Sequence, residues 1–162
     1  MNLDEPLAFF ITWTVYGTHL QGDEHGWHRW GKGHQAPRPN LRVWRKEKLK
    51  YPILTLDHRQ REAVESECKR HCELRGWPHW ALNARSNHCH IVVTAPAKSG
   101  DNVRDQLKAN STRKLRELSP IFQDRPVWTV GGDWKCINDE DGLETVCRYV
   151  RDAQDLKRRD DN

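Results

Sequence analysis

The spacing of the apolar positions changes along the chain and predicts the order of the secondary-structure elements. Residues 7–15 (LAFFITWTV) are rich in residues that favour strands, so we predict a first strand, central in its sheet. Asp57, with Gln60 three residues later, forms a capping-box pattern, and helical spacing of buried-type residues continues to a stop signal at Gly76. A helix is therefore predicted between Asp57 and Gly76.

The middle of the chain predicts a strand hairpin followed by a second helix. Residues 80–85 alternate apolar and polar side chains, a tight turn follows at 86–87, and 88–94 predicts the partner strand. Asp101 or Asn102 is then the expected N-cap of a helix. Its apolar stripe is formed by Val103, Leu107, Ser111, Leu115 and Leu118.

The last third of the chain predicts one more strand region and a final helix. Residues 127–138 hold Gly131-Gly132 between two strand-like runs, which indicates either one strand with a bulge or a hairpin. Asp139 or Asp141 can cap a helix that continues to about Asp155. The predicted order is β-α-β-β-α-β-α, which favours an α+β fold of the ferredoxin-like type: an antiparallel sheet with helices packed on it.

Residues 17–52 interrupt this pattern as a long insertion within what we expect to be a single domain over residues 1–162. The segment has five glycines, almost no apolar periodicity, and tryptophans among basic residues. Long segments without predicted structure inside a compact domain are either functional or flexible. Two interpretations stay open: an insertion that faces nucleic acid and orders on binding, or a flexible surface loop.

Composition narrows the compartment and the kind of partner. The chain has a net charge of +4 and eight tryptophans, which suits a polyanion on whose bases aromatic rings stack. Five cysteines, an odd number without a C-x-x-C pair or a signal peptide, predict reduced thiols in a cytoplasmic protein. The apolar run 7–13 is too short to span a membrane, so we expect no membrane partner.

Cys68, Cys72 and His71 share a stretch of the first predicted helix and raise the question of zinc. Structural zinc normally takes four ligands, and no fourth one is apparent nearby. Small thiols on the buried face of a helix are common. The sequence therefore favours core packing over a zinc site here.

A more informative pair is His88 and His90, which flank Cys89 on the predicted strand. Side chains alternate along a strand, so both imidazoles leave the same face, and Cys89 leaves the other. Two such rings can share one metal ion and leave positions open for a substrate. The alternative is a pair of strand histidines with structural partners.

The surrounding residues favour the metal interpretation. Asn87-His88-Cys89-His90, followed by an apolar strand that ends in Ala95-Pro96, resembles the HUH motif (histidine, hydrophobic residue, histidine) of single-tyrosine transposases, including REP-associated tyrosine transposases. The resemblance covers most of the chain from Leu7 to Asp155, without the insertion. It implies the HUH endonuclease fold and a nucleophilic tyrosine on a late helix, where Tyr149 stands.

The resemblance also implies a third metal ligand, a Gln or Asn four residues after the tyrosine. Here that position is Ala153, which cannot ligate. Gln154 is favoured by residue type, although an ideal helix turns it about 140° from Tyr149 and turns Asp152 only about 60°. A local irregularity in the helix would reconcile the preference with the geometry. Oxygen from either side chain would suit Mg²⁺ or Mn²⁺.

By resemblance, the expected activity is metal-dependent cleavage and strand transfer of single-stranded DNA that carries a hairpin. Tyr149 would form a 5′-phosphotyrosine intermediate and release a 3′-hydroxyl. Two alternatives stay open: a catalytically inactive or domesticated DNA-binding module on the same fold, and a nuclease of the relaxase or replication-initiator type. A homodimer is also left open.

The second predicted helix carries the candidate contacts to DNA phosphate. These residues are Arg104, Lys108, Arg113 and Lys114. A solvated basic helix face is the alternative interpretation.

Overall fold

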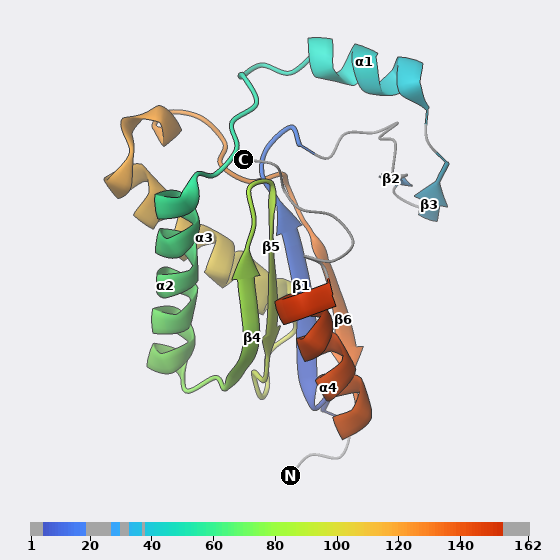
Figure 1. The fold of residues 1–162 in the computed structure, drawn as a ribbon, viewed down its shortest axis with the longest axis vertical. Coiled ribbons are helices and arrows are strands. Elements are labelled where there is room, and N and C mark those ends of the chain that lie inside the picture. Colours follow the sequence, from blue (N-terminus) through green and yellow to red (C-terminus); the bar gives the residue numbers. More distant parts are fainter. Residues whose placement is uncertain (1–4, 19–26, 30–32, 37, 154–162) are drawn as a thin grey trace.

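The computed structural model describes residues 5–18, 27–29, 33–36 and 38–153 (Figure 1). The strands are β1 (Ala8–Thr14), β2 (Trp27–Arg29), β3 (Gly33–Gln35), β4 (His79–Ala84), β5 (His88–Val93) and β6 (Asp133–Ile137). The helices are α1 (Pro39–Glu47), α2 (His58–Arg75), α3 (Gly100–Leu118), η1 (Pro120–Phe122), α4 (Glu140–Arg148) and η2 (Tyr149–Ala153).

Four strands form one sheet in the order β4-β5-β1-β6, and every neighbouring pair is antiparallel. Apart from the elements of residues 27–47, the chain order is β1, α2, β4, β5, α3, β6, α4, as predicted. Helices α2 and α3 cover one face of the sheet, and α4 lies on the other (Figure 1). The ferredoxin-like α+β prediction is confirmed.

Helix α2 has the predicted ends. The Asp57 side chain accepts from the backbone N–H of Gln60, and the Gln60 side chain accepts from the N–H of Asp57, which completes the capping box. Gly76 ends the helix in the left-handed conformation at φ 71°. Local sequence chemistry is sufficient at both ends.

Helix α3 begins earlier than predicted, and the prediction of Asp101 or Asn102 as its cap was wrong. Ser99 is the cap, and its side chain accepts from the Asn102 N–H at 3.1 Å. The first helical residue is Gly100, and the Trp134 ring covers it: a Cβ there would lie 2.2 Å from a ring carbon, so this position requires glycine. The packing of a distant tryptophan thus explains the glycine at this position, and the Ser99 cap marks where the helix begins.

The region before β6 is a strand with a bulge rather than a hairpin. Trp128 bridges to Val15, and Asp133 pairs with Thr12, so two more residues lie on this side than on β1. Gly131 and Gly132 take up the excess at φ 80° and 135°. A Cβ on Gly132 would lie 2.7 Å from the Thr12 carbonyl oxygen, so the close approach requires glycine.

The insertion contains structure that the sequence did not predict. Its described part holds the hairpin of β2 and β3 and the helix α1, which starts with Pro39 at its first turn. The pattern missed α1 because its apolar side chains do not face the core: Val43 is 55% exposed and Trp44 is 48% exposed. Residues 19–26, 30–32 and 37 of the insertion lie outside the described residues.

Candidate active site on the face covered by α4

The two motif histidines leave the same face of β5. Cys89, Ile91 and Val93 enter the large core under α2 and α3, whereas His88 and His90 lie on the α4 side, where their ring centroids are 4.5 Å apart. The cross-strand register aligns His88 with Thr14 and His90 with Thr12. The period of the strand therefore produces the pair, as the sequence predicts.

Each histidine has an oxygen partner at Nδ1. Thr12 Oγ1 lies 2.7 Å from His90 Nδ1, and Asn87 Oδ1 lies 2.5 Å from His88 Nδ1. An amide oxygen only accepts, so His88 donates from Nδ1, and the neutral ring then has its lone pair on Nε2. Thr12 Oγ1 can accept in the same way. Oriented rings with the lone pair on Nε2 are the form in which histidines bind a divalent metal.

Tyr149 lies beside His90, in the helical layer that covers this face of the sheet. It follows α4, is half-buried, and its ring centroid lies 6.0 Å from that of His90. Phe10 stacks on His90 at 5.5 Å and meets Tyr149 edge to face at 6.3 Å. The Tyr149 phenol and the His90 imidazole thus both pack against the Phe10 ring.

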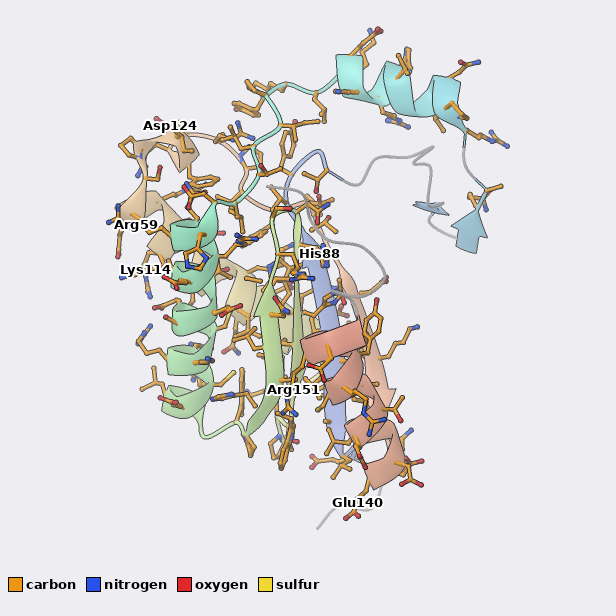
Figure 2. The ribbon with its side chains drawn as sticks, in the orientation of Figure 1. Arg59, His88, Lys114, Asp124, Glu140 and Arg151 are labelled. Carbon is orange, nitrogen blue, oxygen red and sulfur yellow. The ribbon has the colours of Figure 1, made fainter. Side chains whose placement is uncertain are left out.

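The turn that carries Tyr149 is fixed to the sheet edge. Asn83 on β4 donates to the Val150 carbonyl at 3.2 Å, and Arg151 donates to the carbonyl of Trp80. Figure 2 places His88 on β5 and Arg151 on the helical segment in front of it. These bonds join residues about 70 positions apart, which no local pattern predicts.

The irregularity that the sequence required is present in this turn. Residues 149–153 form a π-helix, which closes its hydrogen bonds from i to i+5 and so holds one more residue per turn than an α-helix. Asp152 is exposed, and Gln154 lies outside the described residues. Among the described residues, no three His, Cys, Asp or Glu side chains gather as a metal site. The histidine pair fits two positions of a metal ion, and the third ligand stays a prediction.

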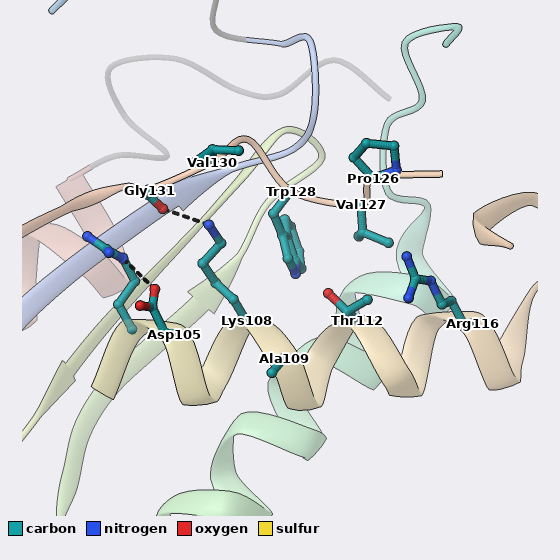
Figure 3. Close-up of a pocket in the computed structure, with 11 residues that line it drawn as sticks. Asp105, Lys108, Ala109, Thr112, Arg116, Pro126, Val127, Trp128, Val130 and Gly131 are labelled. Carbon is teal, nitrogen blue, oxygen red and sulfur yellow. Dashed lines mark hydrogen bonds and ion pairs between the residues drawn. The ribbon is translucent and has the colours of Figure 1, made fainter. Parts of the chain in front are cut away.

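The predicted phosphate contacts lie on the other face of the sheet and hold parts of their own chain. Arg104 pairs with Asp101 at 2.9 Å and with Asp105 at 3.1 Å. Lys108 Nζ donates to the carbonyls of Thr129 and Gly131, each at 2.7 Å. Figure 3 shows the bond to Gly131. Burial and the neighbouring Arg104 lower the pKa of Lys108 below its usual value. These two cations stabilise the bulge before β6.

The remaining two candidates lie further along α3. Arg113 bridges to Glu67 of α2 at 2.7 Å, and Lys114 is half-buried. An open groove of about 480 Å³ separates α3 from residues 126–131, and its walls include Arg116 and Trp128 (Figure 3). Most cations of this helix already have partners within the chain, which disfavours their contact with phosphate. Contact of this helix with DNA stays a prediction.

The cysteines of α2 are part of the core. Cys68 and Cys72 are buried, and burial raises the pKa of the Cys72 thiol to about 12 and raises that of Cys68 further. His71 contacts Gln106 of α3 through Nε2 at 2.8 Å and packs edge to face on Trp77. Protonated thiols and a histidine with a structural partner support core packing over zinc.

Solved structures have the same architecture as the fold described above. A provisionally assigned transposase from Deinococcus radiodurans superposes with a TM-score of 0.53 at 11% identity, over 93% of this chain and 92% of that one. A REP-associated tyrosine transposase bound to a REP hairpin superposes with a TM-score of 0.52 at 11% identity, over 93% of this chain and 67% of that one.

At this identity the likeness shows the fold alone. No protein-family model matches the chain, and no curated protein does. In the described part of the chain, no helix has the length and apolar character needed to cross a bilayer.

Proposed function

We propose that this protein is a metal-dependent endonuclease and strand transferase of single-stranded DNA, of the transposase type. The observation that carries the proposal is the meeting of His88, His90 and Tyr149 on one face of the sheet, with the His90 and Tyr149 rings 6.0 Å apart. A hairpin in the DNA is part of the proposal, since one structural neighbour is bound to a REP hairpin.

Tyr149 is the proposed nucleophile. Its phenol oxygen would attack the scissile phosphorus, lose its proton, and displace the 3′-oxygen of the preceding nucleotide. A 5′-phosphotyrosine bond and a free 3′-hydroxyl result, and the covalent bond conserves the energy for rejoining to another strand. Free tyrosine has a pKa of about 10, so the attack needs charge neutralisation at the phosphate.

His88 and His90 would hold the divalent ion, Mg²⁺ or Mn²⁺, that supplies this neutralisation. Thr12 and Asn87 keep both rings oriented for that role.

Gln154 is the proposed third ligand. Because the π-turn after Tyr149 contains an extra residue, the position that follows Tyr149 on the same side moves from i+4 to i+5. In the sequence, i+4 is Ala153 and i+5 is Gln154. The turn thus supports Gln154 over Asp152, which lies at i+3.

Tyr149→Phe tests the proposal, because it retains the ring against Phe10 and His90 and removes only the hydroxyl. The protein is incubated with Mn²⁺ and a labelled single strand that contains a hairpin, and adducts that resist denaturation are counted on a gel. We expect the adduct to vanish in Tyr149→Phe, with unchanged melting temperature and hairpin binding. Tyr16→Phe and Tyr51→Phe are the matched controls and should keep it. An adduct that persists in Tyr149→Phe would reassign the nucleophile.

Ala153 at the family position of the third ligand favours a second candidate, a DNA-binding module that has lost catalysis. The same gel separates the two candidates. If the second candidate is correct, the unmodified protein itself binds the hairpin but forms no adduct in Mg²⁺ or Mn²⁺. A nuclease of the relaxase or replication-initiator type would form the same adduct through the same intermediate.

A further inference from the structure

The positive charge of the chain is concentrated in one segment of the insertion. Residues 38–50 hold six Lys or Arg and one Glu, a net charge of +5, whereas the whole chain carries +4. The rest of the molecule is therefore close to neutral, at −1. Helix α1 occupies most of this segment and stands beyond the end of the sheet at which His88 lies (Figures 1 and 2). A polyanion would meet its strongest attraction there.

The same helix exposes an aromatic ring among its cations. Trp44 is 48% exposed, with the Arg45 guanidinium 5.1 Å from its ring centroid and Lys48 Nζ at 5.7 Å. A tryptophan that packs into a core has its apolar area covered, as for Trp13, whose exposed fraction is 0%. Trp44 instead leaves part of its ring open to a ligand, with two cations next to it.

A second aromatic cluster lies where the insertion joins the sheet. Tyr16 and Tyr51 meet edge to face at 6.1 Å, and the Arg125 guanidinium lies 5.6 Å from one ring and 5.7 Å from the other. Lys50 Nζ lies 5.4 Å from the Tyr51 ring. All three side chains of the cluster are half-buried, so part of each remains open to solvent.

This cluster is next to the proposed active site along the chain. Tyr16 follows β1 by two residues, and the last residue of β1, Thr14, is the cross-strand partner of His88. The Arg125 backbone is held by Arg116, which donates to its carbonyl at 2.8 Å. A strand leaving the histidine pair at this end of β1 would pass the tyrosines before it reaches α1.

We propose that Trp44, Tyr51, Tyr16 and Arg125 form a stacking surface for the unpaired bases of the single strand next to the cleavage site. The exposed cations Arg38, Arg45, Lys46, Lys48 and Lys50 complete this surface. Aromatic faces flanked by Arg and Lys bind unpaired bases without sequence preference, because every base has a π-face and every nucleotide a phosphate. In duplex DNA the faces of the paired bases are covered by stacking. A duplex would therefore contact the cations through its phosphates and would not stack on the aromatic side chains. The inference rests on the proposed function for its ligand, and it is tested separately below.

Binding is measured in EDTA, without cleavage, as the fluorescence anisotropy of a labelled oligothymidylate of about 15 nucleotides. We expect Trp44→Ala and Tyr51→Ala each to weaken binding by about tenfold, the usual loss for one stacked base. Trp44→Phe and Tyr51→Phe keep a ring and should keep most of the affinity. Trp44→Ala should leave the binding of a blunt duplex within about twofold.

A charge-reversal pair isolates the electrostatic part. Lys46→Glu with Lys48→Glu should weaken binding and flatten its salt dependence. Lys69→Glu with Arg75→Glu changes the net charge equally on the exposed surface of α2 and is the matched control. Equal losses in the two double variants would reduce the effect to net charge and overturn the proposed location.

Three further outcomes would contradict the proposal. The first is unchanged affinity in both alanine variants, and the second is an equal loss of affinity for duplex and single strand. The third is displacement of the oligonucleotide by anionic phosphatidylserine vesicles at low lipid concentration, which would identify a membrane-binding surface.

Photocrosslinking of a 5-iodouracil oligonucleotide to the unmodified protein gives an answer that does not depend on folding of variants. Crosslinks should map to Trp44, Tyr51 or Tyr16, and crosslinks only on α2 or α3 would refute the surface. If the proposed chemistry fails, Tyr149 forms no adduct while this binding pattern stays intact.

Discussion

The two faces of the central sheet differ in what they bury. Under α2 and α3, residues such as Trp13, Ile11, Ile91 and Leu107 are sealed at 0% exposure in one large cluster. Under α4 the apolar cluster is much smaller, and next to it lie the polar groups of His88, His90 and Thr12, with Phe10 and Tyr149 only partly buried.

Consecutive residues of one strand serve the two faces. On β5, Cys89 and Ile91 enter the large core, and between them His90 points to the α4 side. The packed face holds the backbone of β5 in place, so the imidazoles on the α4 face are positioned without a large core of their own. Rigid elements with supporting contacts position catalytic side chains more accurately than loops do. Substitutions on the α2/α3 face should therefore lower the stability of the fold, and substitutions on the α4 face should lower activity.

The largest expected effect is the loss of activity in His90→Ala. A partner that only orients a metal ligand is worth 10- to 100-fold, so removal of the ligand itself should reduce adduct formation by at least about 100-fold. Cys89→Ala, the neighbour on the opposite face, is the control and should keep the adduct. Gel quantification in Mn²⁺ measures both. Equal loss in the two variants would mean that the strand, and not the histidine, was damaged.

Ile91→Ala should have the opposite signature. Truncation of this fully buried side chain should lower the free energy of unfolding by roughly 2–5 kcal/mol, through lost burial and a residual cavity. Urea denaturation measures the change. Ile121→Ala, at a residue that is 51% exposed, should change stability by much less. Below its unfolding transition, Ile91→Ala should retain the adduct, and a folded but inactive variant would break the separation of the two faces.

Thr12→Val tests the support behind His90 at nearly constant volume. It removes the oxygen that lies 2.7 Å from His90 Nδ1, so half-saturation with Mn²⁺ should need roughly 10- to 100-fold more metal. Thr14→Val is the matched control, because Thr14 donates to Thr129 rather than to a histidine. A titration of adduct formation against Mn²⁺ distinguishes them. Identical metal dependence in all three proteins would remove Thr12 from the site.

Glu67→Gln gives the smallest expected effect and probes the packed face through pH. Hydrogen bonds and charge from Arg70 and Arg113 lower the pKa of Glu67 below its usual 4.5, so its ionised form is favoured in the folded protein. The stabilisation is present above pH 4.5 and is lost as pH falls through the lowered pKa. Because both arginines are half exposed, we expect only about 1 kcal/mol at pH 7.

Thermal melts of Glu67→Gln and the unmodified protein should therefore differ at pH 7 and converge in acid. Glu144→Gln is the control, since Glu144 meets Arg148 on an exposed helix surface. A Glu67→Gln difference that stays constant down to acid pH would show that the carboxylate charge contributes nothing.

The sequence by itself determined the elements and the faces wherever the information is local. The period of β5 separates His88 and His90 from Cys89, and the Asp57–Gln60 box and Gly76 bound α2, because alternation and capping depend on residues a few positions apart. The order of these elements sufficed for the ferredoxin-like fold. The insertion escaped this reasoning, because α1 turns its apolar residues to solvent and so has no buried stripe to detect.

Only the tertiary structure decided which distant groups meet. It set Thr12 behind His90, the Tyr149 ring beside that of His90, and the Tyr16–Tyr51–Arg125 cluster at the end of β1. It also paired Arg113 with Glu67. From the sequence alone, Arg113 was a candidate contact to DNA phosphate. Such contacts depend on strand register and on helix docking across many tens of residues. These are properties of the packed chain as a whole, whereas a sequence pattern records only what lies within a few turns of helix or one strand.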